Sequence, residues 1–178
     1  GGDRVAVSVA KGYVELDVKT GEIKKEVTKF TGVESLRRLP NGNTILGGNS
    51  DGGATLQELD PSDVLVPGRK VTFSLSNLRL FRRTPQGTFL LGVGKDLVEV
   101  NWDKQTLWSM TIPGGDYVYM GLRVDKNIAV TSGYGAAIQI IDPAGKKVVT
   151  TIGGKSQPDA SSITPNFYAG FQVLANGN

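Results

Sequence analysis

The sequence predicts an all-β protein, a β-propeller of four blades with four antiparallel strands in each blade. Three observations lead to this prediction. A short marker recurs at intervals of 41 to 43 residues, which is the period of a four-stranded propeller blade. A turn motif near the N-terminus recurs at the extreme C-terminus. No helical periodicity is present, and 24 of the 178 residues are glycine, as expected for a chain built of hairpins.

The recurring marker ends an alternating strand and precedes turn-forming residues. Its four copies are Glu15-Leu16-Asp17, Glu58-Leu59-Asp60, Glu99-Val100-Asn101 and Ile140-Ile141-Asp142. Turn formers such as Thr20-Gly21 and Pro143-Ala144-Gly145 follow. The marker therefore identifies the third strand of each blade.

The turn motif is Leu39-Pro40-Asn41-Gly42-Asn43, in which Asn41-Gly42 is predicted to form a hairpin turn into the strand at Thr44. Its second copy, Leu174 to Asn178, has no strand after it, whereas Arg4 to Val9 is a strand with no partner before it. We therefore expect the N-terminal strands to complete the C-terminal blade and close a ring. Two alternatives remain: the chain is half of a dimeric eight-bladed ring, or it is a fragment of a larger propeller.

This periodicity makes residues 1–178 a single β-propeller domain. A loop rich in Gly, Ser and Pro, residues 153–165, is expected to separate the fourth blade from the last strand. The blades are assigned as Arg4 to Thr28 with an inner strand from Asn166 to Leu174, then Val33 to Phe73, Asn77 to Ile112, and Tyr117 to Ile152.

The composition of the chain excludes several classes of function. The net charge of +3 is weak and its acidic and basic residues are interleaved, which excludes a nucleic-acid-binding stripe. No apolar run has the length of a membrane span, so no membrane partner is expected. The chain has no His and no Cys, which removes the usual catalytic triads and zinc sites. The sequence therefore predicts no catalytic residues, no metal and no cofactor.

Two motifs carry a resemblance to known families. Val14 to Ile23 resembles the repeat of quinoprotein-type (PQQ-like) propellers, with an alternating strand, Asp and a Thr-Gly turn. Leu39 to Asn43 followed by Glu58-Leu59-Asp60-Pro61 resembles arylsulfotransferase-like secreted bacterial propellers. The resemblance implies a propeller fold and an extracytoplasmic location, periplasmic or secreted. Sulfuryl transfer in that family relies on a histidine, so the resemblance does not carry that activity to this chain.

Arginine and glutamate also recur in register. Arg38, Arg83 and Arg123 lie one residue before the ends of the inner strands, and Glu15, Glu58 and Glu99 share a position on the third strands. One interpretation is a ring of guanidinium groups that binds an anion or sulfated glycan. The other, which we favour, is an Arg–Glu pair within or between blades, repeated with the blade.

The function predicted is non-catalytic binding of a small molecule, glycan or protein partner at the mouth of the central channel, by a monomer or homodimer. Four positions there are equivalent by the repeat but differ in chemistry, namely Glu34, Arg79, Tyr119 and Ala169, and two neighbouring loops add Asn49 and Tyr134. The expected ligand-binding residues are Glu34, Asn49, Arg79, Tyr119 and Tyr134. The alternative is a carbohydrate-active lyase or hydrolase that uses Asp51, Asp96, Asp116 and Tyr134.

Overall fold

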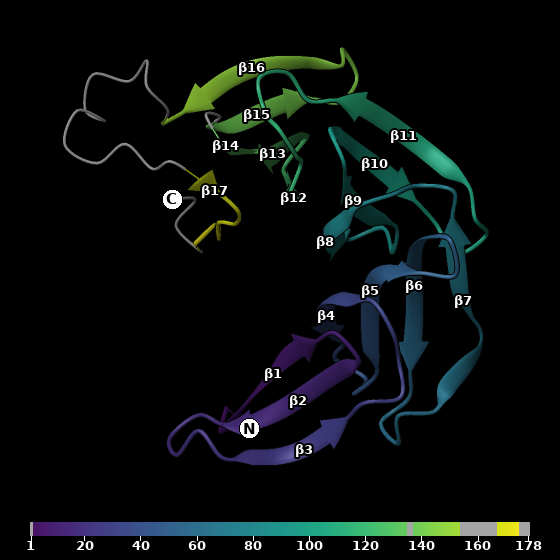
Figure 1. Ribbon diagram of the computed structural model, residues 1–178. Coiled ribbons are helices and arrows are strands. Elements are labelled where there is room, and N and C mark those ends of the chain that lie inside the picture. The colour runs from purple at the N-terminus through teal and green to yellow at the C-terminus, as the bar shows by residue number, and fades with distance from the viewer. Residues whose placement is uncertain (1, 135–136, 154–166, 175–178) are drawn as a thin grey trace. The chain divides into compact units, whose positions relative to one another are not determined.

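A computed structural model describes residues 2–134, 137–153 and 167–174 of the chain (Figure 1). Its described residues form β-strands, turns and irregular links, and contain no helix. The contacts divide the chain into two compact units, Gly1–Leu80 with Trp102–Gln105, and Phe81–Asn101 with Thr106–Asn178. Each unit is described by itself below.

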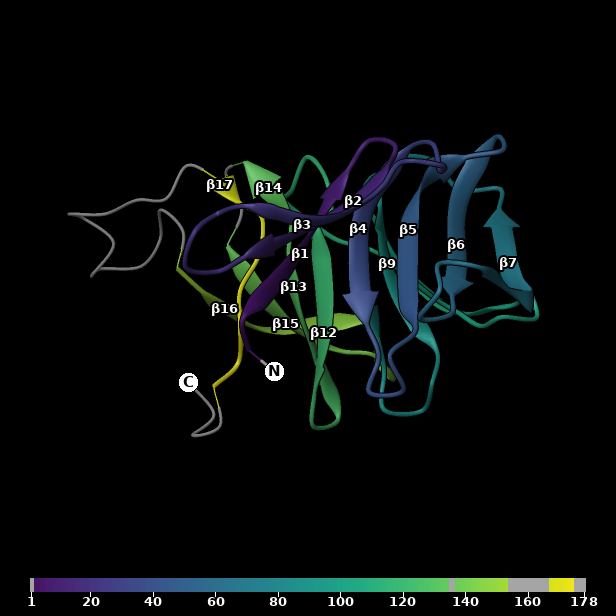
Figure 2. The same ribbon diagram turned by 90° about the horizontal axis from the view of Figure 1, so that it is seen from below.

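The first unit contains two antiparallel sheets of consecutive strands (Figures 1 and 2). The first sheet has three strands in the order β1-β2-β3, and the second has four in the order β4-β5-β6-β7. Their bounds are Arg4–Val9 (β1), Gly12–Asp17 (β2), Ile23–Val27 (β3), Val33–Arg38 (β4), Thr44–Ser50 (β5), Gly53–Leu59 (β6) and Leu65–Phe73 (β7).

The boundary between the units passes through β8, the first strand of the third sheet. This sheet has the order β11-β10-β9-β8, and the fourth has the order β12-β13-β15-β16. Strands β14 and β17 form a separate two-stranded sheet. The bounds are Leu78–Arg83 (β8), Phe89–Val93 (β9), Asp96–Val100 (β10), Thr106–Thr111 (β11), Met120–Val124 (β12), Asn127–Thr131 (β13), Gly133–Tyr134 (β14), Ile138–Asp142 (β15), Lys147–Ile152 (β16) and Phe167–Tyr168 (β17).

The all-β class and the division into four sheets are confirmed, and each sheet begins and ends within a few residues of the predicted blade. The C-terminal strand differs from the prediction. It was expected from Asn166 to Leu174 beside the first sheet, but Phe167–Tyr168 pairs with Gly133–Tyr134, and residues 169–174 belong to no strand. The predicted loop lies almost wholly outside the described residues. Closure of a ring and a single domain stay predictions.

The two recurring sequence motifs, the Asp that ends the marker and the Asn-Gly pair, both form turns. Asp17 and Asp60 each use a carboxylate oxygen to accept backbone N–H groups two to four residues further on, which fixes the turn after the third strand position. In the Asn-Gly turn, Gly42 has a φ of 87° and donates its N–H to the carbonyl of Leu39 at 3.0 Å. The recurring residues are therefore explained by the backbone of the repeat.

Each unit has its own apolar core. In the first unit, Tyr13 and Val27 of the first sheet pack with Val33, Leu46 and Leu59 of the second. In the second unit, the cluster comprises Leu90, Leu97, Ile112, Val118, Ile128, Val130 and Ile141. Both clusters join side chains of successive sheets, so the sheets of each unit pack face to face.

Candidate functional site

Two of the recurring Arg residues form ion pairs with recurring Glu residues of the preceding sheet, whereas the partners of Glu58 are Asn43 and Arg69 of its own sheet. Arg38 of β4 pairs with Glu15 of β2, and Arg123 of β12 pairs with Glu99 of β10. The two carboxylates are largely buried, with side-chain exposures of 13% and 10%. In both cases a sheet donates its Arg to the Glu of the preceding sheet. These contacts support the structural interpretation, because both guanidinium groups are used inside the fold.

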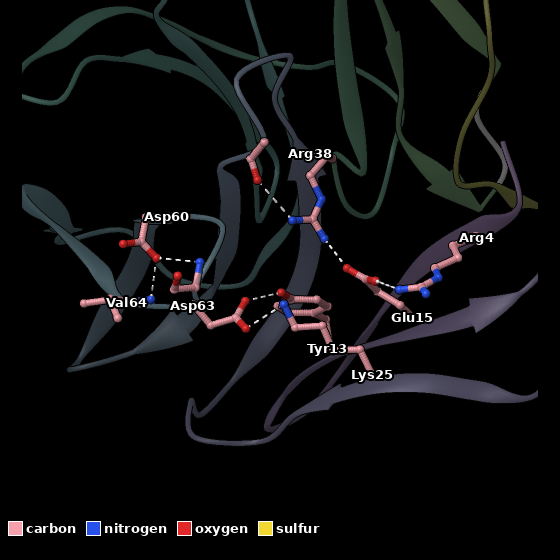
Figure 3. Close-up of polar contacts among 10 residues, drawn as sticks. Arg4, Tyr13, Glu15, Lys25, Arg38, Asp60, Asp63 and Val64 are labelled. Atoms are coloured by element: carbon pink, nitrogen blue, oxygen red, sulfur yellow. Dashed lines mark hydrogen bonds and ion pairs between the residues drawn. The ribbon is translucent and has the colours of Figure 1, made fainter. Parts of the chain in front are cut away.

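A second polar network joins the first and second sheets (Figure 3). The hydroxyl of Tyr13 donates to one carboxylate oxygen of Asp63, and the Lys25 ammonium contacts the other at 2.6 Å. Lys25 and Arg38 each lie 5.7 Å from the Tyr13 ring centre. Tyr13 is fully buried, so this network fixes the turn between β6 and β7 on the first sheet.

The network shifts two pKa values. Burial raises the pKa of Asp63, but the hydrogen bonds from Lys25 and Tyr13 outweigh it and hold the pKa below the usual 3.8. Burial likewise lowers the pKa of Lys25, but its hydrogen bonds to Asp63 and Tyr13 raise the net value above 10.5. The ion pair thus stabilises the folded state between these two values. Its contribution is lost as the pH falls through the folded-state pKa of Asp63, or rises through that of Lys25.

We therefore expect Asp63→Asn to reduce the acid sensitivity of the fold. Wild-type protein should lose unfolding free energy as the pH falls below about 4, and the variant should lose less over the same range, because its side chain no longer titrates. Urea unfolding at a series of pH values measures both slopes. Asp3→Asn, at an exposed position, is the control and should keep the wild-type slope. Equal slopes for Asp63→Asn and wild type would contradict the assignment.

Asn49 acts as a clamp between β5 of the second sheet and Leu78, the first residue of β8. Its side-chain carbonyl accepts the N–H of Leu78 at 2.8 Å, and its amide donates to the carbonyl of Leu78 at 2.9 Å. The backbone N–H of Asn49 also donates to Gly32 at 2.7 Å. The side-chain amide therefore makes the same two hydrogen bonds to Leu78 that a paired strand would make, and it holds the start of β8 against the end of β5.

A hollow of about 300 Å³ lies beside this clamp. Asp51 and Gly52, both with positive φ, form the two-residue turn between β5 and β6 at one side of it. In the described part of the chain its lining consists of neutral Asn, Ser and Gly residues, with no aromatic side chain. The residues are Asn49, Ser50, Gly52, Gly53, Ser76 and Asn77. Such a surface offers hydrogen-bond donors and acceptors to a small neutral ligand.

The five predicted ligand-binding residues divide between the units. Glu34 on β4 is exposed, Asn49 lines the hollow, and Arg79 on β8 is half-buried and directly follows Leu78. Tyr119 and Tyr134 belong to the second unit, where Tyr119 donates its backbone N–H to Thr131 at 2.9 Å. Their assembly into one site stays a prediction.

The carboxylates of the rival enzyme hypothesis have separate surroundings. Asp51 pairs with Lys70 at 2.8 Å, and Asp96 accepts the hydroxyl of Thr111 at 2.6 Å. Asp116 is exposed.

Sequence reasoning missed a second hollow, also of about 300 Å³, beside the Tyr13 network. It is lined by Glu26, Val27, Thr28, Lys29, Ser62 and Asp63. Asp63 has a φ of 63° in the turn between β6 and β7, and its partner Tyr13 is 50 residues away in the chain. No local pattern indicates a contact over that separation.

No family model matches the sequence, and no curated protein matches it. Solved structures do resemble the fold. A protein of unknown function from Bacteroides caccae has 17% sequence identity and a TM-score of 0.77; the match covers 98% of this chain and 64% of that protein. This chain therefore spans less than two thirds of that neighbour.

Two further neighbours come from B. thetaiotaomicron. The extracellular domain of a putative one-component system has 12% identity and a TM-score of 0.56, with 86% of this chain and 22% of that chain covered. The corresponding domain of a putative hybrid two-component system has 11% identity and a TM-score of 0.54, with 87% and 23% covered. Among the described residues no helix is long and apolar enough to cross a membrane. At these identities the likeness is one of fold.

Proposed function

We propose that this chain is a non-catalytic binding domain that works outside the cytoplasm, with its four sheets as blades of a propeller of the quinoprotein-like or arylsulfotransferase-like kind. The extracytoplasmic location is supported by the neighbours that are extracellular domains of putative sensor systems. The propeller is supported by the repeat period and by the face-to-face packing of successive sheets within each unit.

The binding site that we propose is the hollow beside Asn49, and the observation that carries it is its construction. The Asn49 clamp fixes both walls, since it holds the end of β5 to the start of β8. Ser76 and Asn77 on the link from β7 are exposed, so their polar atoms are available to a ligand. Rigid walls with neutral polar groups favour a small hydroxyl-bearing ligand, such as a sugar unit of a glycan. Arg79 and Glu34 are the proposed additional contacts from the same unit.

The binding function is favoured over the enzyme because Asp51, the carboxylate nearest to the hollow in sequence, is paired with Lys70. A glycosidase needs two carboxyl groups facing each other across the substrate. Among the residues that the structure describes, the lining of the hollow contains no carboxylate.

A glycan array followed by calorimetry with the best-bound sugar tests this proposal. The double variant Ser76→Ala/Asn77→Gly removes two polar side chains, and glycine accepts the positive φ of 58° at position 77. We expect it to weaken binding about tenfold or more, because each lost hydrogen bond contributes about 0.5–1.5 kcal/mol. Ser62→Ala, in the other hollow, is the matched control and should bind as wild type does. Binding that survives the double variant would place the site elsewhere.

A further inference from the structure

The second hollow is lined mainly by polar and charged residues from two elements of the first unit. Glu26, Thr28 and Lys29 come from the end of β3 and the link that follows it. Ser62 and Asp63 come from the turn between β6 and β7. The volume of about 300 Å³ lies at the lower end of the range for ligand pockets, which favours a small molecule.

The wall that the turn forms is held by hydrogen bonds. One carboxylate oxygen of Asp60 accepts the N–H of Ser62 at 2.8 Å and the N–H of Val64 at 2.9 Å. Asp63 accepts the Tyr13 hydroxyl, which joins the turn to the first sheet (Figure 3). A wall fixed in this way needs little ordering when a ligand binds.

The charged groups around the hollow divide into paired and unpaired ones. Lys25 contacts one carboxylate oxygen of Asp63 at 2.6 Å, and Tyr13 donates to the other. Glu26 and Lys29 line the hollow and are exposed, and among the described residues neither forms an ion pair, with the other or with a third group. The hollow therefore offers one carboxylate and one ammonium to a ligand.

The ammonium of Lys29 acts on the Asp63 side of the hollow. It lies 5.9 Å from the Phe30 ring centre. Burial raises the pKa of Asp63, the hydrogen bonds from Lys25 and Tyr13 lower it, and the positive charge of Lys29 lowers it further. Because Lys25 already balances the charge of Asp63, the positive charge of Lys29 remains to attract a ligand anion.

We propose that this hollow is a second binding site, which takes a small zwitterion with one ammonium and one carboxylate group, such as a free α-amino acid. The ligand ammonium pairs with the Glu26 carboxylate, and the ligand carboxylate pairs with the Lys29 ammonium. The hydroxyls of Thr28 and Ser62 line the same hollow and supply further hydrogen bonds. A neutral ligand would desolvate both protein charges without pairing them, which is unfavourable.

The second site is independent of the first. The hollow beside Asn49 has a neutral lining and shares no lining residue with this one. The two proposals therefore stand or fall separately.

Thermal-shift measurements with the common free amino acids, followed by calorimetry with the best binder, test the proposal. N-acetylation of that amino acid removes its ammonium charge, and amidation removes its carboxylate charge. We expect each derivative to bind about tenfold or more weakly than the free amino acid, because each has lost one charge-assisted contact. These measurements use the wild-type protein, so they do not depend on the folding of any variant.

Glu26→Gln and Lys29→Met assign the two charges. Both side chains are exposed, and Met keeps an aliphatic stem beside Phe30, so both variants should keep the wild-type melting temperature without ligand. Each should weaken the free amino acid about tenfold or more. Glu26→Gln should leave the affinity for the N-acetyl derivative unchanged, and Lys29→Met should leave the affinity for the amide unchanged, since the matching contact is already absent.

The double variant Ser76→Ala/Asn77→Gly changes only the other hollow and should bind the amino acid as wild type does. Failure of every free amino acid to bind, or wild-type affinity in either single variant, would overturn the proposal. Full affinity for the N-acetyl derivative would instead indicate an anion site at Lys29 alone, and full affinity for the amide a cation site at Glu26 alone. Either result would overturn the zwitterion as the ligand.

Discussion

Replacing Tyr13 by alanine is expected to lower the free energy of unfolding by about 3–5 kcal/mol, the usual cost of removing a buried aromatic side chain. Tyr13 is fully buried and packs with Val27, Leu46 and Leu59 in the core that joins the first two sheets. The truncation leaves a cavity and also deprives Asp63 of a hydrogen-bond donor. Denaturant unfolding with a strand-sensitive signal measures the loss.

Tyr13→Phe separates the two effects. It keeps the ring, its packing and its contacts with Lys25 and Arg38, and it removes the hydroxyl. We expect a loss of about 1–3 kcal/mol, the cost of leaving a buried acceptor with one partner fewer. If the alanine variant were no less stable than the phenylalanine variant, the ring would not be part of the core.

The fold was predictable from the sequence because the recurring residues are those that the equivalent turns of each sheet require. Asp17 and Asp60 recur since each closes a turn with its carboxylate. Gly87 occupies the position in the third sheet that Gly42 occupies in the second, and its φ is also 87°. The same reasoning located the Arg–Glu register, and the pairs Arg38–Glu15 and Arg123–Glu99 follow it. Periodic residues report local geometry that every sheet shares.

The C-terminal strand was predicted less well, because a strand motif does not determine its partner. Ser132 interrupts the fourth sheet between β13 and β14, so Gly133–Tyr134 is left to pair outside that sheet, and Phe167–Tyr168 pairs with it. Both segments have free backbone groups that need a partner. The sequence shows this need without showing which edge meets it.

The candidate site was predicted in part. Asn49 was selected as a ligand contact, and it lines the hollow, but its side-chain amide is occupied by the backbone of Leu78. Ser76 and Asn77 line the same hollow and were not selected, because their link from β7 carries no distinctive motif. The contact between Asn49 and Leu78, which are 29 residues apart in the chain, depends on how two sheets pack, and no local sequence pattern indicates that packing.

The close backbone approach at Gly48 leads to the second large effect, a loss of about 2–4 kcal/mol in Gly48→Ala. A methyl group there would lie 1.9 Å from the carbonyl oxygen of Gly32 and 2.9 Å from the Cα of Val33. Both are backbone atoms, so the start of β4 must move away from β5. That movement breaks the 2.7 Å hydrogen bond from Asn49 to Gly32 and displaces the buried Val33.

Gly52→Ala in the same hairpin is the matched control. Its φ is +80°, yet a methyl group there meets nothing within 4 Å, so only the backbone conformation opposes the change. We expect a loss of about 1 kcal/mol from that strain. Denaturant midpoints of the two variants give the comparison, and a Gly48→Ala variant as stable as Gly52→Ala would contradict the close approach. Because Asn49 forms one wall of the hollow, Gly48→Ala should also weaken any ligand bound there, whereas Gly52→Ala should not displace the clamp.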